Sequence, residues 1–153
     1  GTCACVYLPR LSDAAEVATL PADVQVLEPE ATPGRKILVI DDEKAVLDVV
    51  RRFLEIAGHQ VVCAPSGSQA VQLLREGLQA DLIILDLMIS KEDGPTNFRD
   101  VRAAAPGIPI LLCTGLVQSD LAQTLLQQGA ADLLRKPFRM NELWYAVNKA
   151  VNG

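Results

Sequence analysis

From residue 35 onward, the sequence alternates five times between a short apolar run and an amphipathic stretch, and this alternation constrains the fold most. The clearest run is Leu82-Ile83-Ile84-Leu85, which stops abruptly at Asp86. Successive large apolar residues are typical of a strand buried on both faces, as in a parallel sheet covered by helices. Strand followed by helix, repeated with short connections, predicts a doubly wound α/β fold: a three-layer sandwich around a five-stranded parallel sheet.

The expected elements follow from the apolar runs and from the breaks between them. Strands are expected at residues 36–40, 60–64, 81–86, 108–113 and 131–135. Helices are expected at residues 46–57, 66–76, 96–105, 120–128 and 140–151. The first helix carries an apolar stripe at helical spacing, formed by Val46, Val49, Val50, Phe53, Leu54 and Ala57. Gly58 is expected to end it.

The composition argues against some classes of partner. Half of the 153 residues are apolar, which is ample for the core of one domain with an appendage. The net charge of −5 and the 4% share of aromatic residues argue against a nucleic-acid partner. No run is long enough to span a bilayer and no signal peptide opens the chain, so we expect no membrane contact by this fragment.

The four cysteines do not form the pattern of a disulfide framework. Cys63 and Cys113 lie inside apolar runs and are expected to be small buried hydrophobic residues. Cys3 and Cys5 lack the nearby His or third Cys that would complete a metal-thiolate site. Unpaired thiols are typical of a reducing compartment, so we expect a cytoplasmic location.

The N-terminal segment differs from the rest of the chain. Residues 1–10 alternate loosely and predict one strand, which cannot be stable by itself. Residues 11–34 are rich in Pro, Ala and acidic residues, as linkers are. We therefore expect a remnant strand at residues 1–10, a linker at 11–34 and a folded domain at 35–153.

Reactive side chains follow four of the five expected strands. Asp41 and Asp42 follow the first strand, Asp86 ends the third, Thr114 follows the fourth and Lys136 follows the fifth. Because the carboxyl ends of parallel strands share one edge of the sheet, these residues should converge. Clustered carboxylates repel one another, and Mg²⁺ would relieve that repulsion through oxygen ligands.

An Asp beside Mg²⁺, a Lys and a hydroxyl is placed to attack phosphorus, because the cations neutralise charge on the transferring phosphoryl group. Each residue also has an ordinary structural interpretation. Asp41 and Asp42 could cap a helix, Thr114 could be a β-branched strand residue, and Lys136 could be a solvated charge. All of these arising together at one edge is far less probable than a shared site. We therefore predict that Asp86 is the nucleophile.

In these motifs, residues 35–153 closely resemble the receiver domain of two-component response regulators and hybrid sensor kinases. The motifs are Ile40-Asp41-Asp42-Glu43, Leu85-Asp86-Leu87-Met88, Asp93-Gly94, residues 109–115, Gly129-Ala130 and Lys136-Pro137-Phe138. The resemblance implies a flavodoxin-like fold with strand order 2-1-3-4-5. It also implies a cis Lys136–Pro137 bond, which proline permits.

The resemblance further implies the role of each site residue. Asp86 would accept phosphate from a phosphohistidine in a His-Asp phosphorelay. Thr114 would hydrogen-bond the phosphoryl group and Lys136 would form an ion pair with it. Mg²⁺ would be held by Asp41, Asp42, Asp86 and the main-chain carbonyl of Met88. The partner would be a histidine kinase core, a histidine phosphotransfer protein, or both, and the fourth helix with the fifth strand is a candidate face for a weak homodimer.

Three positions depart from the family pattern. Leu133 replaces the usual aromatic switch residue, so the conformational response should be muted or carried by the fourth helix alone. Ser90 replaces a Pro, which should loosen the loop after Asp86. Arg139 replaces an Asp that often caps the last helix, which should slightly weaken that helix start.

Residues 1–10 also resemble, over a short stretch, the final strand of a histidine-kinase ATP-binding domain. This implies that the chain is the C-terminal piece of a hybrid sensor kinase, without the motifs that bind ATP. The only histidine, His59, follows the helix-ending Gly58 and is expected at the surface, not as a phosphate donor.

Two other functions fit part of the pattern. A phosphorylation-independent interaction module would keep the receiver-like fold and use the face formed by Leu133 and the fourth helix for docking. A Mg²⁺-dependent phosphohydrolase with an Asp nucleophile fits the charges, but so short a chain lacks a cap domain or substrate pocket.

Overall fold

The computed structural model describes residues 34–89, 93–115 and 120–152. Its strands are β1 (Lys36–Ile40), β2 (Gln60–Ala64), β3 (Leu82–Asp86), β4 (Ile110–Thr114) and β5 (Asp132–Arg135). Its helices are α1 (Lys44–Ile56), α2 (Gly67–Arg75), α3 (Gly94–Ala104), α4 (Asp120–Gln127) and α5 (Met140–Asn152). The predictions of a strand at residues 1–10 and of a linker up to residue 33 lie outside the described residues.

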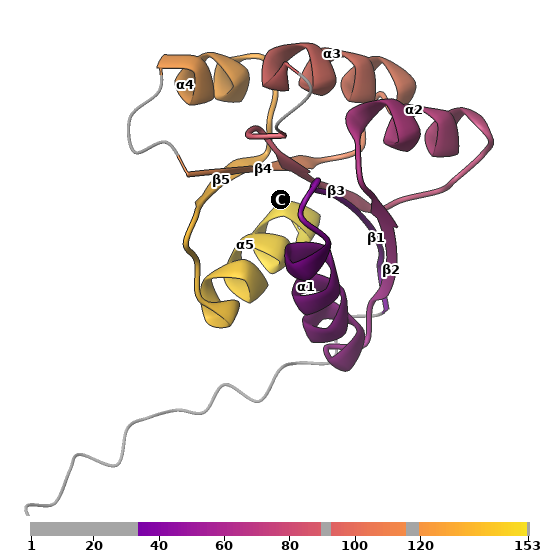
Figure 1. The fold of residues 1–153 in the computed structure, drawn as a ribbon, viewed down its shortest axis with the longest axis vertical. Coiled ribbons are helices and arrows are strands. Elements are labelled where there is room, and N and C mark those ends of the chain that lie inside the picture. Colours follow the sequence, from indigo (N-terminus) through magenta and orange to yellow (C-terminus); the bar gives the residue numbers. More distant parts are fainter. Residues whose placement is uncertain (1–33, 90–92, 116–119, 153) are drawn as a thin grey trace, which may run out of the picture.

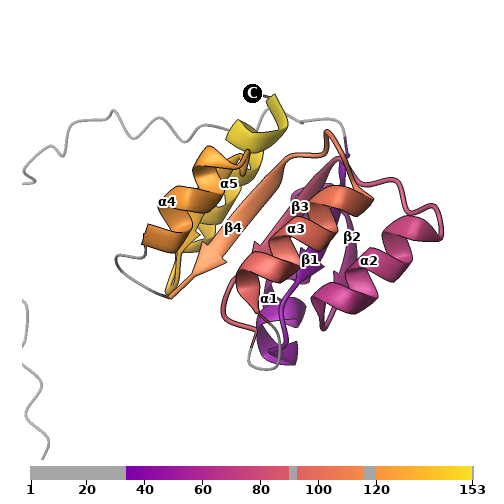
Figure 2. The same cartoon turned by 90° about the horizontal axis from the view of Figure 1, so that it is seen from above.

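The strands form one parallel sheet in the order β2-β1-β3-β4-β5. Figure 1 shows α1 and α5 on one face of this sheet and α2, α3 and α4 on the other. Figure 2 views the molecule from the side of α2, α3 and α4, with the sheet behind them. The predicted three-layer sandwich and the strand order 2-1-3-4-5 are therefore confirmed.

Two hydrophobic cores lie on the two faces of the sheet, because successive strand residues point in opposite directions. In β1, Leu38 and Ile40 face the core beneath α2, α3 and α4, whereas Ile37 and Val39 face the core beneath α1 and α5. In β3, the run from Leu82 to Asp86 is buried throughout, since this strand has neighbours on both sides. This burial confirms the interpretation of the run as a central strand.

The helix ends follow local sequence signals. Ser66 precedes α2, and its side chain accepts a hydrogen bond from the Gln69 N–H at 3.2 Å, as an N-cap does. Gly58 and Gly129 follow α1 and α4 with φ of 91° and 98°, a left-handed conformation in which a Cβ would be strained. These ends agree with the predicted helix boundaries.

Helix α3 begins earlier than expected, at Gly94 rather than at residue 96. The Asp93 side chain caps it by accepting hydrogen bonds from the Thr96 N–H at 3.2 Å and the Thr96 hydroxyl at 2.6 Å. Pro95 fits the first turn, where its missing N–H costs no helical hydrogen bond. The Gly-Pro pair therefore belongs to the helix start and not to the preceding loop.

The surface position predicted for His59 is wrong, because its side chain is buried at 5% exposure. Its Nδ1 accepts a hydrogen bond from the Arg35 N–H at 3.3 Å, and the Gln60 N–H donates to the Arg35 carbonyl at 2.8 Å. The pairing of β1 with β2 thus brings the start of the domain against the imidazole. The prediction considered only the neighbouring glycine.

The predicted stripe of α1 is partly wrong. Leu47, Val50 and Leu54 are the buried residues of this helix, whereas Val49 is 53% exposed. The helix is therefore rotated relative to the predicted stripe, and one apolar edge faces solvent. Among the described residues, none of the helices combines the length and the apolar character needed to cross a membrane.

Candidate functional site

Three carboxylates converge at the C-terminal edge of the sheet. Asp41 directly follows β1 and is buried, Asp42 is exposed, and Asp86 is the last residue of β3 and is buried. One carboxylate oxygen from each lies within 4.8 Å of the others. The neighbouring strands β1 and β3 produce this convergence: Ile40 is aligned with Leu85, so the residues that follow them, Asp41 and Asp86, lie side by side. This part of the predicted site is therefore assembled.

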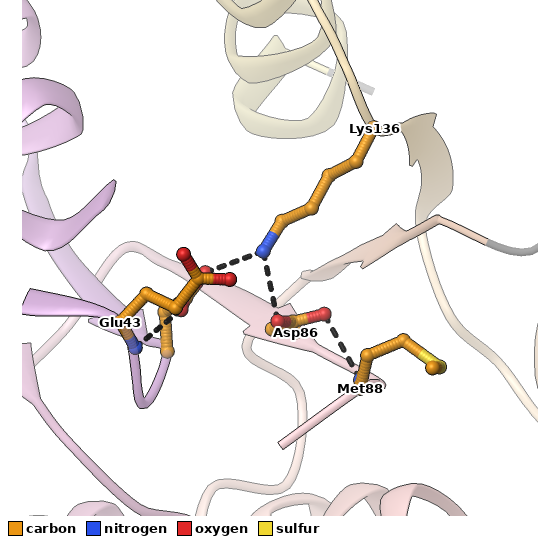
Figure 3. Close-up of polar contacts among 5 residues, drawn as sticks. Glu43, Asp86, Met88 and Lys136 are labelled. Carbon is orange, nitrogen blue, oxygen red and sulfur yellow. Dashed lines mark hydrogen bonds and ion pairs between the residues drawn. The ribbon is translucent and has the colours of Figure 1, made fainter. Parts of the chain in front are cut away.

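Lys136 lies between two of these carboxylates. Its Nζ donates to Asp41 Oδ2 at 2.6 Å and to Asp86 Oδ2 at 2.8 Å (Figure 3). The side chains of both acids are 4% exposed, and that of Lys136 is 20% exposed. A half-buried cation between two buried carboxylates is part of an ion-pair network, not a solvated surface charge.

The second oxygen of each buried carboxylate is held by the main chain. The Met88 N–H donates to Asp86 Oδ1 at 3.0 Å, and the Glu43 N–H donates to Asp41 Oδ1 at 2.9 Å (Figure 3). Each acid therefore binds the N–H two residues further on, as Asp side chains commonly do in turns. The loops after β1 and β3 thus fix the carboxylates before any ligand binds.

The ion pairs determine the charge of Lys136. Burial alone would lower the pKa of its ammonium group, but the hydrogen bonds to Asp41 and Asp86 outweigh burial and raise the pKa above its ordinary value. Lys136 is therefore a fixed positive charge at any physiological pH. It can neutralise an anion that arrives beside Asp86.

Thr114 and Lys136 reach the same edge from neighbouring strands. Thr114 ends β4 with 1% exposure, and its carbonyl accepts a hydrogen bond from the Lys136 N–H at 2.8 Å. Asp86 is aligned with Cys113, so Thr114 lies one residue further along the adjacent strand. The Lys136–Pro137 bond is cis, as the family resemblance implied.

Among the described residues, the thiol of Cys113 lies closest to this edge, on β4 opposite Asp86. Burial raises the pKa of the Cys113 thiol to about 12, so the sulfur stays protonated and unreactive. Cys113 is 3% exposed, which confirms its predicted role as a small buried residue, whereas Cys63 is only half-buried.

The donor set fits a hard divalent cation. Carboxylate oxygens are the ligands that Mg²⁺ prefers, and exposed Asp42 leaves room for the waters that this ion retains. Met88 contacts Asp86 through its N–H, and the metal-binding role predicted for its carbonyl stays a prediction.

A groove that sequence reasoning missed lies beside Lys136. It has a volume of about 530 Å³ and an almost wholly apolar lining formed by Ala45, Val46, Val49, Val50, Pro137, Phe138 and Met140. The apolar pattern of α1 predicted its helical character but not which edge would face solvent. This groove could be identified only from the structure, because it depends on how α1 is oriented against the loop after β5.

Two further predictions concern positions that depart from the family pattern, Ser90 and Leu133. The prediction for Ser90 falls outside the described residues. Leu133, in place of the aromatic residue, is half-buried and packs against the core beneath α2, α3 and α4.

Comparisons with known proteins agree with this geometry. The sequence profile of the response regulator receiver domain matches residues 37–148. The crystal structure of a response regulator receiver domain protein from Clostridium thermocellum has a TM-score of 0.71 and 33% identity, over 77% of this chain and 94% of that chain. The chemotaxis protein CheY4 from Vibrio cholerae has a TM-score of 0.70 and 26% identity, over 76% of this chain and 98% of that chain.

A CheY-like receiver domain protein from Methanospirillum hungatei shares the fold, with a TM-score of 0.72 and 21% identity over 78% of this chain and 94% of that chain. The profile match covers most of the chain, and the acidic triad occupies the edge at which such a site is expected. The chain therefore belongs to the response regulator receiver domain family.

Proposed function

We propose that Asp86 is the phosphoacceptor of a His-Asp phosphorelay. The observation that carries this proposal is the pairing of Lys136 Nζ with both Asp41 and Asp86 inside a cluster of three carboxylates. A cation fixed beside a buried carboxylate neutralises the charge that a transferring phosphoryl group brings. The same cation would have little function in an acidic cluster that only capped a helix.

In the proposed reaction, an Asp86 carboxylate oxygen attacks the phosphorus of a phosphohistidine. The new P–O bond forms while the P–N bond breaks, and the electron pair of that bond returns to the imidazole, which takes up a proton. Asp86 becomes an acyl phosphate. Lys136 pairs with the new phosphoryl oxygens, and the Thr114 hydroxyl donates to one of them.

Asp41, Asp42 and Asp86, with the Met88 carbonyl, are the residues that would hold Mg²⁺. The ion supplies charge neutralisation to the phosphoryl group when it is bound. The chain itself supplies orientation: the Met88 N–H holds Asp86 Oδ1, and the Glu43 N–H holds Asp41 Oδ1. Both acids are thus aligned before the phosphodonor arrives.

The apolar groove beside Lys136 supports a protein phosphodonor. Val49 is 53% exposed on its rim, and an apolar surface next to a reactive site is typical of a docking face. We infer that the partner is a histidine kinase core or a histidine phosphotransfer protein, and that the parent chain is a cytoplasmic hybrid kinase with a linker before this domain. Residues 11–34, which are rich in Pro, Ala and acidic residues, support such a linker.

The signal produced by phosphorylation would pass through Thr114 to α4. An added phosphoryl group brings nearly two negative charges to this edge. Leu133 stands where the family usually has an aromatic residue. It has no ring that could swing inward behind Thr114 and so signal phosphorylation. The expected response is therefore a shift of the start of α4.

Mass spectrometry tests the proposal. The protein is incubated with Mg²⁺ and a small phosphodonor such as acetyl phosphate, and one phosphoryl group is expected on the wild type and none on Asp86→Asn. Asp100→Asn, at an exposed position of α3, is the matched control and should be phosphorylated normally. Undiminished phosphorylation of Asp86→Asn would exclude Asp86 as the acceptor. Partner binding that is the same in wild type and Asp86→Asn would support the phosphorylation-independent module.

A further inference from the structure

Arg102, in the last turn of α3, joins three separate segments of the domain. Its Nη1 donates to the Ile108 carbonyl at 2.7 Å, and its Nη2 donates to the Gly129 carbonyl at 2.7 Å. The guanidinium group also lies 5.7 Å from the centre of the Phe98 ring, on its own helix. Within the part of the chain that the structure describes, both of these charged hydrogen bonds are made to main-chain carbonyls.

The two carbonyl groups that accept these hydrogen bonds lie next to β4 and α4. Ile108 precedes β4, and Gly129 immediately follows α4 with its left-handed φ of 98°. Both points lie at the N-terminal edge of the sheet, because β4 starts there and α4 returns there. The carboxylates lie at the opposite edge. Arg102 thus holds the end of α4 that is remote from Asp86.

The rest of α4 is held less firmly. Among its residues only Ala122 and Leu125 are buried. Its first residue, Asp120, is exposed and lies shortly after Thr114 in the chain. A helix with few buried side chains can move easily where nothing else fixes it. The two hydrogen bonds of a planar guanidinium group are among the stronger polar contacts available to a main-chain carbonyl.

We propose that Arg102 is the fixed pivot of α4, so that the conformational response is confined to the N-terminal half of this helix. The inference rests on the proposed phosphorylation of Asp86 and specifies how the fold transmits it. The movement is largest at Asp120, where α4 begins, and fades toward Gly129. Arg102 acts as a positioning residue and contacts no part of the phosphorylation site.

The first test needs no phosphate. Hydrogen exchange is measured on the unphosphorylated wild type, Arg102→Met and the control Arg99→Met, which removes an exposed Arg from the same helix. The reporters are the Gly129 and Ala130 N–H groups, which donate to the Leu126 and Leu125 carbonyls. Their exchange should accelerate about tenfold or more in Arg102→Met, as expected for loss of hydrogen bonds to a charged group. It should be unchanged in Arg99→Met.

The amides of β3 serve as the reference for global unfolding. If their exchange rises as much as that of Gly129 and Ala130, or if Arg102→Met behaves like Arg99→Met, Arg102 is not a local pivot. A rise confined to the end of α4 supports the proposal.

The second test adds Mg²⁺ and the small phosphodonor. In the wild type, phosphorylation should change exchange at residues 120–123 and leave residues 128–131 unaltered, whereas in Arg102→Met the change should extend to residues 128–131. A change that reaches Gly129 in the wild type would overturn the proposal. If the wild type takes up no phosphate, the proposed function fails and the pivot loses its role, while the first test still decides whether Arg102 holds this end of α4.

Discussion

Lys136 is the residue on which the charge balance of the site depends. Its Nζ is within 2.8 Å of an oxygen of each buried carboxylate, and the Asp42 carboxylate lies close to both. Removing one partner of a buried ion pair leaves a charge that neither water nor protein compensates. Lys136 therefore has a structural role even before any phosphoryl group arrives.

We predict that Lys136→Met lowers the free energy of unfolding by about 3 kcal/mol in the absence of Mg²⁺. Added Mg²⁺ should stabilise this variant more than the wild type, because the ion replaces the missing positive charge. Urea unfolding with Mg²⁺ and with a chelator measures both effects. Lys149→Met is the control: its 2.8 Å ion pair with Asp132 is exposed and should matter far less. Equal losses in the two variants would show that Lys136 does not balance the buried charge.

His59 gives the domain a pH dependence at the opposite edge of the sheet. Burial, with a smaller contribution from the Arg35 charge, lowers the pKa of its imidazole below 6.5. The unfolded chain therefore binds a proton more readily than the folded chain does, and stability falls as the pH drops below about 6.5.

We predict that His59→Asn reduces this loss, because Asn offers an oxygen near the position of Nδ1 for the Arg35 N–H but does not titrate. Unfolding free energies of both proteins are measured between about pH 7 and pH 5, where the difference between the two curves isolates the imidazole. A difference that does not change with pH would contradict the prediction.

At the scale of single elements, different side chains provide the hydrogen bonds that stabilise the helix starts. Ser66 and Asp93 cap α2 and α3 with side-chain oxygens. Before α5, Arg139 offers no such oxygen, but its N–H donates to Glu142 Oε2 at 2.7 Å. This is one half of a capping box, and it compensates part of the weakness expected from Arg139.

We predict that Ser66→Ala lowers the free energy of unfolding by about 1 kcal/mol, because the Gln69 N–H loses its acceptor. Ser66→Thr keeps a hydroxyl at the same position and should retain most of the stability. Denaturant unfolding of the three proteins measures the difference. If Ala and Thr are equally destabilising, the hydroxyl is not the source of the cap.

At the scale of the whole molecule, α2 and α3 pack tightly against each other on one face of the sheet. A Cβ added to Gly67, at the start of α2, would lie 2.3 Å from Asn97 Oδ1, on α3. Asn97 is buried at 6% exposure and therefore cannot move aside into solvent. Gly67 is thus required by a neighbouring helix and not by its own backbone.

We predict that Gly67→Ala destabilises the domain by about 2 kcal/mol through overpacking, although Ala is the better helix former. A double-mutant cycle with Asn97→Ala tests the cause, since the double variant should lose less stability than the sum of the single losses. Strict additivity would place the cost of Gly67→Ala elsewhere.

Local sequence determined the elements and the composition of the site. The run from Leu82 to Asp86 could be predicted as a central strand because burial on both faces requires consecutive apolar residues. Asp41, Asp86, Thr114 and Lys136 could be expected at one edge because parallel strands all end there. These inferences needed only strand direction and the order of residues.

Tertiary structure determined the distances and the burial that depend on contacts between segments distant in the sequence. The Lys136 ion pairs join residues 95 and 50 positions apart, and no local pattern gives their distances. His59 is buried by the paired start of β1, and Val49 is exposed by the rotation of α1. A local pattern reports the preferences of one element, whereas burial and contact depend on how that element packs against its neighbours.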